Sequence, residues 1–317
     1  MSEPSPGTQL WNLLRGALGT RALALAAELR VANALADGPR RVDELAREVG
    51  ADADTLHRLL RALASDGVFA EDEPGVFRNT EASELLARDG WDDFAHLFGG
   101  VWYRTVAELD ASGEPTFARI FGTDFWSWLA EHPRERAAFD RAMEQGKESR
   151  IDRVAGIAWR GDEVVVDVGG GNGSLLAGVL ERHPGLRGIV FDLPETDRDE
   201  PALGGRIRFV EGSFFEHVPE GDVYVLSTVL HDWSDEDAAR ILRTLRAAAP
   251  GHARLVVLDA VVQHGNEPDG AKWLDLLVLA QFGGRERDEA QWRALLAATG
   301  WDPVSLRDGL IEARPSN

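Results

Sequence analysis

The sequence contains no cysteine, and this absence removes several kinds of chemistry at once. Disulfide bonds, thiolate zinc sites and cysteine nucleophiles all require the missing side chain. Among the eight histidines no two lie three or four positions apart, so no helical metal site is visible and we expect no metal.

Basic residues are scarce relative to acidic ones. Lys and Arg number 34 against 54 Asp and Glu, which gives a net charge of −20. Phosphate backbones and anionic lipid surfaces repel a chain of this charge. We therefore expect neither nucleic acid nor a membrane as a partner.

Long apolar runs are also missing. The most apolar early stretch, residues 22–36, is interrupted by Glu28 and Arg30 and is too short to span a bilayer. The first residues, MSEPSPGTQLWNLL, lack the basic start and apolar run of a signal peptide. We expect a soluble cytoplasmic protein.

What is present suits a globular chain of about two domains, with 317 residues of which 44% are apolar. Residues 1–110 are predicted to be mostly helical, because apolar residues recur at steps of three and four. Within them, residues 42–79 predict two helices and then two short strands around the turn EDEPG. This order is typical of a winged helix.

A winged helix can bind DNA or serve as a scaffold. Residues 41–79 carry five arginines against nine carboxylates, whereas a DNA-binding domain normally presents a basic face. We favour the scaffold. A transcription regulator with a ligand-sensing domain remains the alternative from a different functional class.

Residues 123–150 are expected to form one or two long helices rich in aromatic side chains. Such side chains occur in cores and in pocket walls, and the sequence favours neither. Residues 111–317 as a whole are assigned to linker helices and a second domain.

Strands alternate with helices from Asp162 onward. The segments EVVVDVG, GIVFDLP, RIRFVEG, DVYVLSTVL and ARLVVLDAVV read as strands, and DPVSLRDGLIEARP as a closing hairpin. Short apolar strands separated by helices predict an α/β fold with a mostly parallel, doubly wound sheet.

A glycine-rich loop, VDVGGGNG, lies where the first of these strands meets its helix. Gly169, Gly171 and Gly173 allow the backbone to approach a ligand closely. Asp192 ends the next strand, where an acid accepts hydrogen bonds from ribose hydroxyls. The dinucleotide pattern GxGxxG requires a third glycine where this chain has Ser174, so the loop favours S-adenosylmethionine over NAD and disfavours a dehydrogenase.

The chain resembles the plant-type small-molecule O-methyltransferases and their bacterial relatives in natural-product tailoring. The resemblance covers nearly the whole chain and rests on VDVGGGNG, FDLP, LSTVLHDWSDEDAARIL and GGRERDEAQWRALLAATGW. It implies an S-adenosylmethionine-dependent O-methyltransferase with a Rossmann-like domain, and an N-terminal winged-helix-like domain that forms a homodimer. The expected acceptor is a small, aromatic natural-product molecule.

The same resemblance assigns roles to individual residues. His231 of the HDW triplet falls on the general base, flanked and oriented by Asp259 and Glu286. The positions implied for the cofactor are Gly169, Gly171, Asp192, Leu193, Ser213, Phe214 and Ser227. Phe139 and Met143 fall on positions that line the acceptor pocket.

Two residues depart from the family pattern. Ser213 stands where an Asp often contacts the adenine amino group, which implies an uncharged or differently built adenine contact. Ser227 replaces the Lys of plant members, as it often does in bacterial ones. Some relatives bind S-adenosylmethionine yet perform other chemistry, and this alternative stays open although the chain keeps His231.

Histidine suits the implied reaction. A phenol, with a pKa of about 10, is mostly neutral at pH 7, and a base with a pKa of about 6.5 is free to accept its proton. A carboxylate behind the ring fixes the tautomer and favours the imidazolium that forms. His231 could instead be an ordinary strand-end histidine, but the carboxyl edge of such a sheet is where its chemistry occurs.

Overall fold

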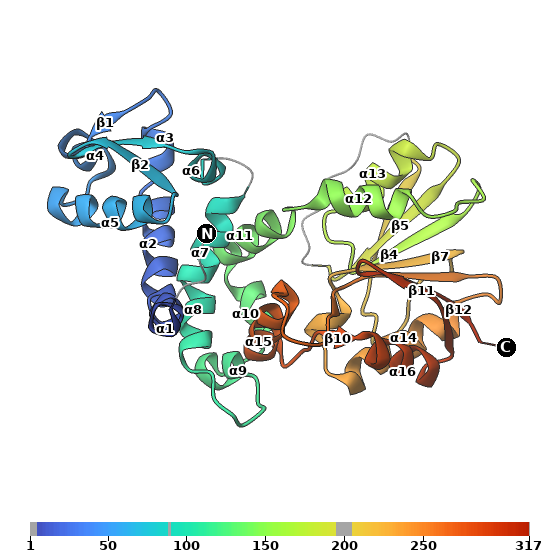
Figure 1. Cartoon of the computed structure of the whole chain (residues 1–317). Helices are drawn as coiled ribbons and strands as arrows, with labels where there is room; N and C mark the ends of the chain where they lie inside the picture. Colours follow the sequence, from blue (N-terminus) through green and yellow to red (C-terminus); the bar gives the residue numbers. More distant parts are fainter. Residues whose placement is uncertain (1–4, 88–89, 195–204, 317) are drawn as a thin grey trace. The chain divides into compact units, whose positions relative to one another are not determined.

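The computed structural model describes residues 5–87, 90–194 and 205–316, which fall into two compact units (Figure 1). The N-terminal unit comprises Met1–Ala107 and Glu131–Gln145, and the C-terminal unit comprises Glu108–Ala130 and Gly146–Asn317. Throughout the described residues, every helix is too short or too polar to cross a bilayer.

The N-terminal unit consists of helices and one small sheet. Its elements are α1 (Pro6–Leu14), α2 (Gly16–Glu28), α3 (Val31–Ala34), β1 (Arg40–Arg41), α4 (Val42–Val49), α5 (Ala53–Ser65), β2 (Phe69–Glu73), β3 (Val76–Asn79), α6 (Glu81–Leu85), α7 (Trp91–Gly99), α8 (Val101–Ala107) and α11 (Pro133–Met143).

The predicted winged-helix pattern is confirmed in α4, α5, β2 and β3. Gly50, with φ of +71°, ends α4, and the carboxylate of Asp52 begins α5 by accepting a hydrogen bond from the backbone N–H of Thr55. The strand β1 adds to the wing, giving the order β1-β3-β2. The wing is therefore larger than the sequence indicated.

The C-terminal unit is an α/β structure. Its elements are α9 (Thr116–Phe121), α10 (Phe125–Glu131), α12 (Lys147–Ala155), β4 (Val164–Val168), α13 (Ser174–Arg182), β5 (Arg187–Asp192), β6 (Ile207–Glu211), β7 (Val223–Ser227), η1 (Leu230–Asp232), α14 (Asp235–Ala248), β8 (Arg254–Leu258), β9 (Val261–Val262), α15 (Gly270–Phe282), β10 (Arg287–Asp288), α16 (Glu289–Ala298), β11 (Trp301–Arg307) and β12 (Leu310–Pro315).

Seven strands form the main sheet, in the order β11-β12-β8-β7-β4-β5-β6. Strands β4 to β8 pair in parallel, and β12 of the closing hairpin pairs antiparallel with both β8 and β11. The predicted doubly wound, mostly parallel sheet is confirmed. Because β4 to β8 run in one direction, the residues that follow these five strands gather at one carboxyl edge.

Alternate residues of these strands pack against different helices. On one face Val166, Tyr224 and Leu255 belong to a core with α14 and α16, and on the other Val165 and Val256 belong to a core with α12 and α13 (Figure 1). Burial of both faces explains the nearly continuous valine and leucine runs of these strands.

The helices around residues 123–150 differ from the expectation. One or two long helices were expected, but α10, α11 and α12 are three shorter ones. Pro133 is the first residue of α11, a position that suits proline because the N–H it lacks would have no partner within the helix. Gly146, with φ of +71°, immediately precedes α12. These breaks divide the segment, and residues 131–145 belong to the N-terminal unit.

Candidate active site

The glycine-rich loop connects β4 to α13 at the carboxyl edge of the sheet. Gly169 adopts φ of +70°, and its N–H donates a hydrogen bond of 2.8 Å to the carbonyl of Phe191 in β5. A Cβ on Gly169 would lie 3.0 Å from Val229, the second residue after β7. The loop thus requires glycine here both for its backbone conformation and for the close approach of Val229.

Asp192 places its carboxylate against this loop. Its Oδ2 accepts a hydrogen bond of 2.7 Å from the backbone N–H of Gly171, and its Oδ1 accepts one of 2.7 Å from that of Leu193. Asp192 ends β5, which is the neighbour of β4. The expected ribose acid therefore lies directly beside the glycine-rich loop.

Ser213 and Phe214 follow β6 and belong to the same cluster. The N–H of Gly212 donates to the carbonyl of Asp192 at 3.1 Å, which holds this segment next to the end of β5. The ring of Phe214 lies 3.9 Å from where a Cβ on Gly169 would be. The structure thus brings the expected adenine and ribose positions together around the loop.

Two buried polar atoms of this cluster find no hydrogen-bond partner among the described residues. They are Oδ2 of Asp167, in β4, and Oγ of Ser227, at the end of β7. Burial, together with the charge of Asp192, raises the pKa of Asp167 to about 7. An unpaired buried acceptor is costly, so these atoms suit a ligand that brings donors or positive charge.

His231 lies on the short 3₁₀ helix η1 that follows β7. Its Nδ1–H donates a hydrogen bond of 2.7 Å to Oε1 of Glu286, which leaves Nε2 as the nitrogen able to accept a proton. The imidazole is 12% exposed and the Glu286 side chain is fully buried. Residues 55 positions apart in the chain thus form one histidine–carboxylate pair.

Two more buried carboxylates surround the pair. Oδ1 of Asp232 lies 3.5 Å from Nε2 of His231, whereas Asp259 makes no hydrogen bond to the imidazole. Burial raises the pKa of Asp232 and of Asp259 to about 7, against the opposing charge of His231. Burial alone would lower the pKa of His231, but the charges of Asp232, Asp259 and Glu286 outweigh it and raise that pKa to about 10.

The geometry separates the two expected flanking acids. Glu286 bonds directly to the ring of His231, while Asp259 acts on it through charge alone. Asp232 was not among the expected site residues, although it is the middle residue of the HDW triplet. Its place in that triplet was the available signal, because a residue next to His231 on a tight turn stays close to it.

Phe139 and Met143 lie on α11 in the N-terminal unit, unlike all the other expected site residues. The Phe139 ring is 6.4 Å from that of Trp102, edge to face. Trp102 is 4% exposed, so Phe139 packs against the buried part of this unit.

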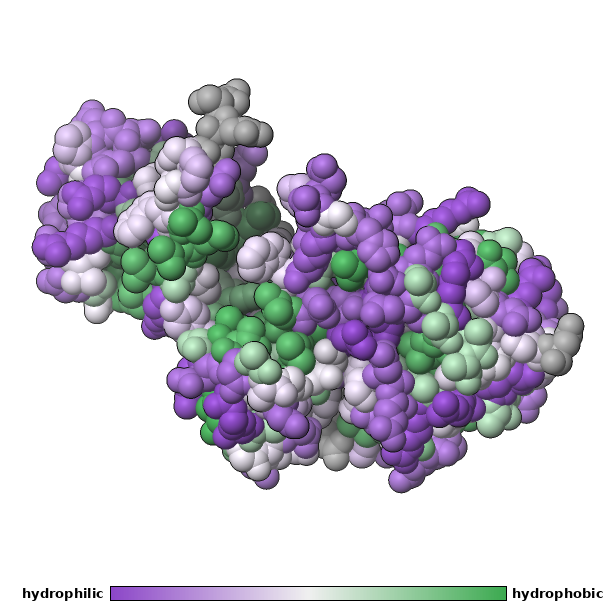
Figure 2. All heavy atoms as spheres, turned by 60° about the horizontal axis from the view of Figure 1, so that its bottom comes forward, coloured by the Kyte–Doolittle hydropathy of each residue, from purple (hydrophilic) through white to green (hydrophobic). Residues whose placement is uncertain are grey.

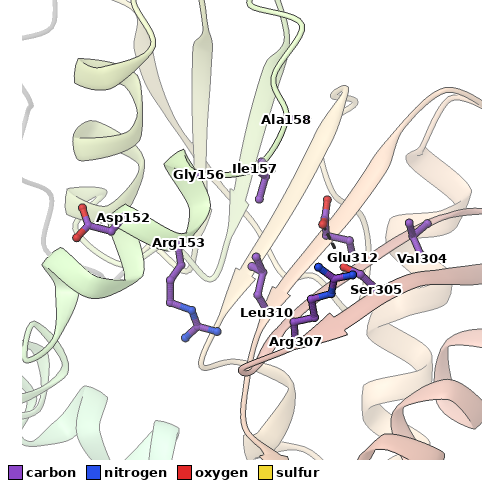
Figure 3. Close-up of a pocket in the computed structure, with 10 residues that line it drawn as sticks. All are labelled: Asp152, Arg153, Gly156, Ile157, Ala158, Val304, Ser305, Arg307, Leu310 and Glu312. Carbon is purple, nitrogen blue, oxygen red and sulfur yellow. Dashed lines mark hydrogen bonds between the residues drawn. The ribbon is translucent and has the colours of Figure 1, made fainter.

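A separate surface hollow of about 560 Å³ lies between α12 and the β11–β12 hairpin. Figure 3 shows its charged and apolar lining, which includes Arg153, Arg307, Ile157 and Leu310. None of the expected site residues lines it. The hollow is therefore separate from the site that the sequence predicts.

Comparisons with known proteins give O-methyltransferase domains for both parts of the chain. Residues 11–89 match a family model described as an O-methyltransferase dimerisation domain, and residues 102–302 match one described as an O-methyltransferase domain. Each model falls largely on one of the two stretches that the sequence distinguishes.

Individual relatives cover almost the whole chain. A phenazine O-methyltransferase of Lysobacter antibioticus is 37% identical over 96% of this chain and 95% of its own. An O-demethylpuromycin O-methyltransferase of Streptomyces alboniger is 38% identical over 97% of this chain and 89% of its own. A solved O-methyltransferase from neocarzinostatin biosynthesis, in complex with S-adenosylmethionine and 2-hydroxy-5-methyl naphthoic acid, has a TM-score of 0.80 and 34% identity over 93% of this chain and 95% of its own.

Proposed function

Because the chain belongs to the O-methyltransferase family, we propose that it methylates a hydroxyl oxygen of a small aromatic natural product, with His231 as the general base. The methyl donor is S-adenosylmethionine. The observation that carries the proposal is the 2.7 Å hydrogen bond between His231 and Glu286, at the sheet edge that also holds the glycine-rich loop. An aromatic acceptor is supported by relatives named for phenazine, hydroxybenzoate and naphthoate compounds.

The residues around the loop suit the donor. Asp192 would accept hydrogen bonds from its ribose hydroxyls, and the buried oxygen of Asp167 would face a cationic group. Ser213 and Phe214 would flank its adenine, and Ser227 would offer a buried hydroxyl. When bound, the donor supplies an electrophilic methyl group and a positive charge.

The carboxylates around His231 set its tautomer and its charge. Glu286 holds the proton of His231 at Nδ1, so Nε2 is the atom that receives the acceptor's hydroxyl proton. The charges of Asp232 and Asp259 stabilise the imidazolium that results. The same charges keep His231 protonated at neutral pH, because its pKa is raised to about 10. Neutral imidazole, the reactive form, therefore increases as the pH rises.

We expect transfer of labelled methyl groups from S-adenosylmethionine to members of a panel of phenols. Below about pH 10 the neutral fraction of His231 grows roughly tenfold per pH unit, so turnover should increase between pH 7 and 9. Scintillation counting of the extracted product measures it. Cofactor binding without labelled product on any hydroxyl would contradict the proposal and favour a family member diverted to other chemistry.

A homodimer formed by the N-terminal unit is the second part of the proposal. Five large apolar side chains on α1 and the start of α2 are 61–73% exposed. They are Leu10, Trp11, Leu13, Leu14 and Leu18. Figure 2 shows an area of hydrophobic side chains, in green, on the surface of the N-terminal unit. A continuous exposed apolar face marks an interface, and these residues fall within or next to the part that matches the dimerisation domain.

We expect the double variant Leu14→Asp/Leu18→Asp to lower the mass in solution from dimer to monomer at micromolar concentration. Burying two carboxylates in an apolar interface costs several kcal/mol. Multi-angle light scattering provides the mass. The matched control is Val304→Asp on β11, another side chain that is 55% exposed, which should leave the dimer intact. A monomeric wild-type protein would refute this part of the proposal.

A further inference from the structure

The turn that carries His231 has little structure of its own. It is a three-residue 3₁₀ helix, η1, between β7 and α14. A catalytic base must be held within a fraction of an ångström to be effective, so something outside the turn has to fix it. Residues 284–287, which precede α16, provide the contacts, and we call them the strap.

The first half of the strap lies directly against the turn. The N–H of Arg285 donates a hydrogen bond of 2.8 Å to the carbonyl of His231. A Cβ on Gly284 would lie 2.1 Å from that same carbonyl oxygen, so only glycine allows the strap to come this close. Glu286, the next residue, binds the imidazole of His231 as described above.

Arg287 fixes the turn on both sides of His231. Its Nη1 donates to the carbonyl of Leu230 at 3.0 Å and its Nη2 to the carbonyl of Trp233 at 3.0 Å. Its Nε donates to Oδ1 of Asp235 at 2.9 Å. One planar guanidinium thus bonds to the residues before and after His231–Asp232 and to the first residue of α14.

Arg287 is buried and packed against Trp292. Its side chain is 0% exposed, and its guanidinium lies 5.3 Å from the ring centre of Trp292. Trp292 in turn donates a hydrogen bond of 3.0 Å to the carbonyl of Ala260, the residue after Asp259. Burial lowers the pKa of Arg287, opposed by the charge of Asp235, but an arginine stays charged in proteins. A buried cation is costly and is retained only with such complete pairing.

We propose that the strap, anchored by Arg287, is a positioning element that holds the backbone of η1 and so aims Nε2 of His231 at the acceptor hydroxyl. The inference rests on the proposed role of His231 as the general base. Arg287 itself touches neither the imidazole nor the glycine-rich loop through any contact described above, so it acts through the turn.

The chain offers a matched control in Arg293, which lies on α16 outside the strap. Its Nη2 lies 2.7 Å from Oε1 of Glu289, and its side chain is 47% exposed. Arg287→Lys and Arg293→Lys are the same substitution at an ion-paired arginine, and only the first removes contacts with the turn.

We expect Arg287→Lys to lower kcat about 10- to 100-fold, because an ammonium cannot reach both carbonyls and the carboxylate at once. The KM for S-adenosylmethionine should stay within about twofold, and Arg293→Lys should resemble wild type. Steady-state kinetics on the full-length protein give both constants. An Arg287→Lys variant with wild-type kcat would overturn the proposal.

A double-variant cycle distinguishes positioning from general stability. If Arg287 acts through His231, then His231→Ala/Arg287→Lys should be no slower than His231→Ala alone. If the double variant instead loses kcat by the product of the two single-variant losses, Arg287 does not act through His231. That result would overturn the positioning role and leave His231 as the base. Full activity of His231→Ala would instead reject the proposed function itself, so the two failures are distinguishable.

Gly284→Ala tests the positioning role of the strap by a second route, in case Arg287→Lys does not fold. The added methyl group meets the carbonyl of His231 and must displace the turn or the strap. We expect a similar fall in kcat that again disappears in the His231→Ala background. Gly270→Ala, where a Cβ meets nothing within 4 Å, is the control and should be unaffected. Wild-type kcat in Gly284→Ala would overturn the proposal.

Discussion

His231→Ala is expected to lower turnover about 10²- to 10⁴-fold, which is what general base catalysis contributes. The substitution removes Nε2 and leaves the carboxylates of Glu286, Asp232 and Asp259 without the group they surround. The glycine-rich loop and Asp192 keep their contacts, so the affinity for S-adenosylhomocysteine should change little. Steady-state kinetics at pH 7.5 and calorimetry provide the two measurements.

The loss should shrink as the pH approaches about 10, because a phenol then ionises without help. His252→Ala is a matched control: its imidazole also pairs with a carboxylate, 2.6 Å from Asp222, but lies before β8 at the amino edge of the sheet. Equal turnover of His231→Ala and wild type at neutral pH would reject either the base or the phenolic acceptor. Repeating the assay with a carboxylic acid, which needs no base, would identify which one.

The two acids should differ in their effects. Glu286→Gln loses the charge that holds the proton at Nδ1 of His231, so it should cost more than Asp259→Asn, because Asp259 makes no hydrogen bond to the imidazole. Both losses should stay below that of His231→Ala, since neither acid takes the proton. This order distinguishes a hydrogen-bonded orienting acid from one that acts by charge alone.

The sheet and the gathering of site residues at its edge could be predicted from the sequence. The strands are short apolar runs separated by helices, which specifies a parallel sheet. Once the strands are parallel, Gly169, Asp192 and His231 must lie at one edge of the sheet, because each lies at or just after the carboxyl end of a strand. The apolar pattern of the strands and the order of strands and helices both predict this sheet, and the structure confirms the fold.

Other features depend on contacts that sequence patterns do not reveal. The helix α15 was not predicted, because the apolar residues of its run KWLDLLVLAQF do not form a single helical stripe. Arg287 reads as a surface charge in GGRERDE, and only folding brings its guanidinium to carbonyls 54 and 57 positions away. Glu286 was assigned from family resemblance, and its contact with His231 likewise spans most of two strand–helix units.

Asp192→Ala is the second prediction with a large expected effect. The carboxylate ends β5 and already accepts the N–H of Gly171, so its removal takes away the ribose acceptor and a contact that shapes the loop. Leaving buried ribose hydroxyls unpaired costs about 1–3 kcal/mol, or roughly 5- to 150-fold in Kd for S-adenosylmethionine. Asp162→Ala, at a carboxylate that is 85% exposed, is the control. Calorimetry that gives an unchanged Kd would reject the assignment.

The same variant should also change how binding depends on pH. In the wild type, burial and the charge of Asp192 raise the pKa of Asp167 to about 7, so its carboxylate is increasingly ionised above that pH. A cationic ligand beside Asp167 should therefore bind more tightly as the pH rises through 7. In Asp192→Ala one of the two causes is gone, the pKa of Asp167 falls, and the rise in affinity should move to lower pH. A rise that stays at the same pH would show that Asp192 and Asp167 do not share one site.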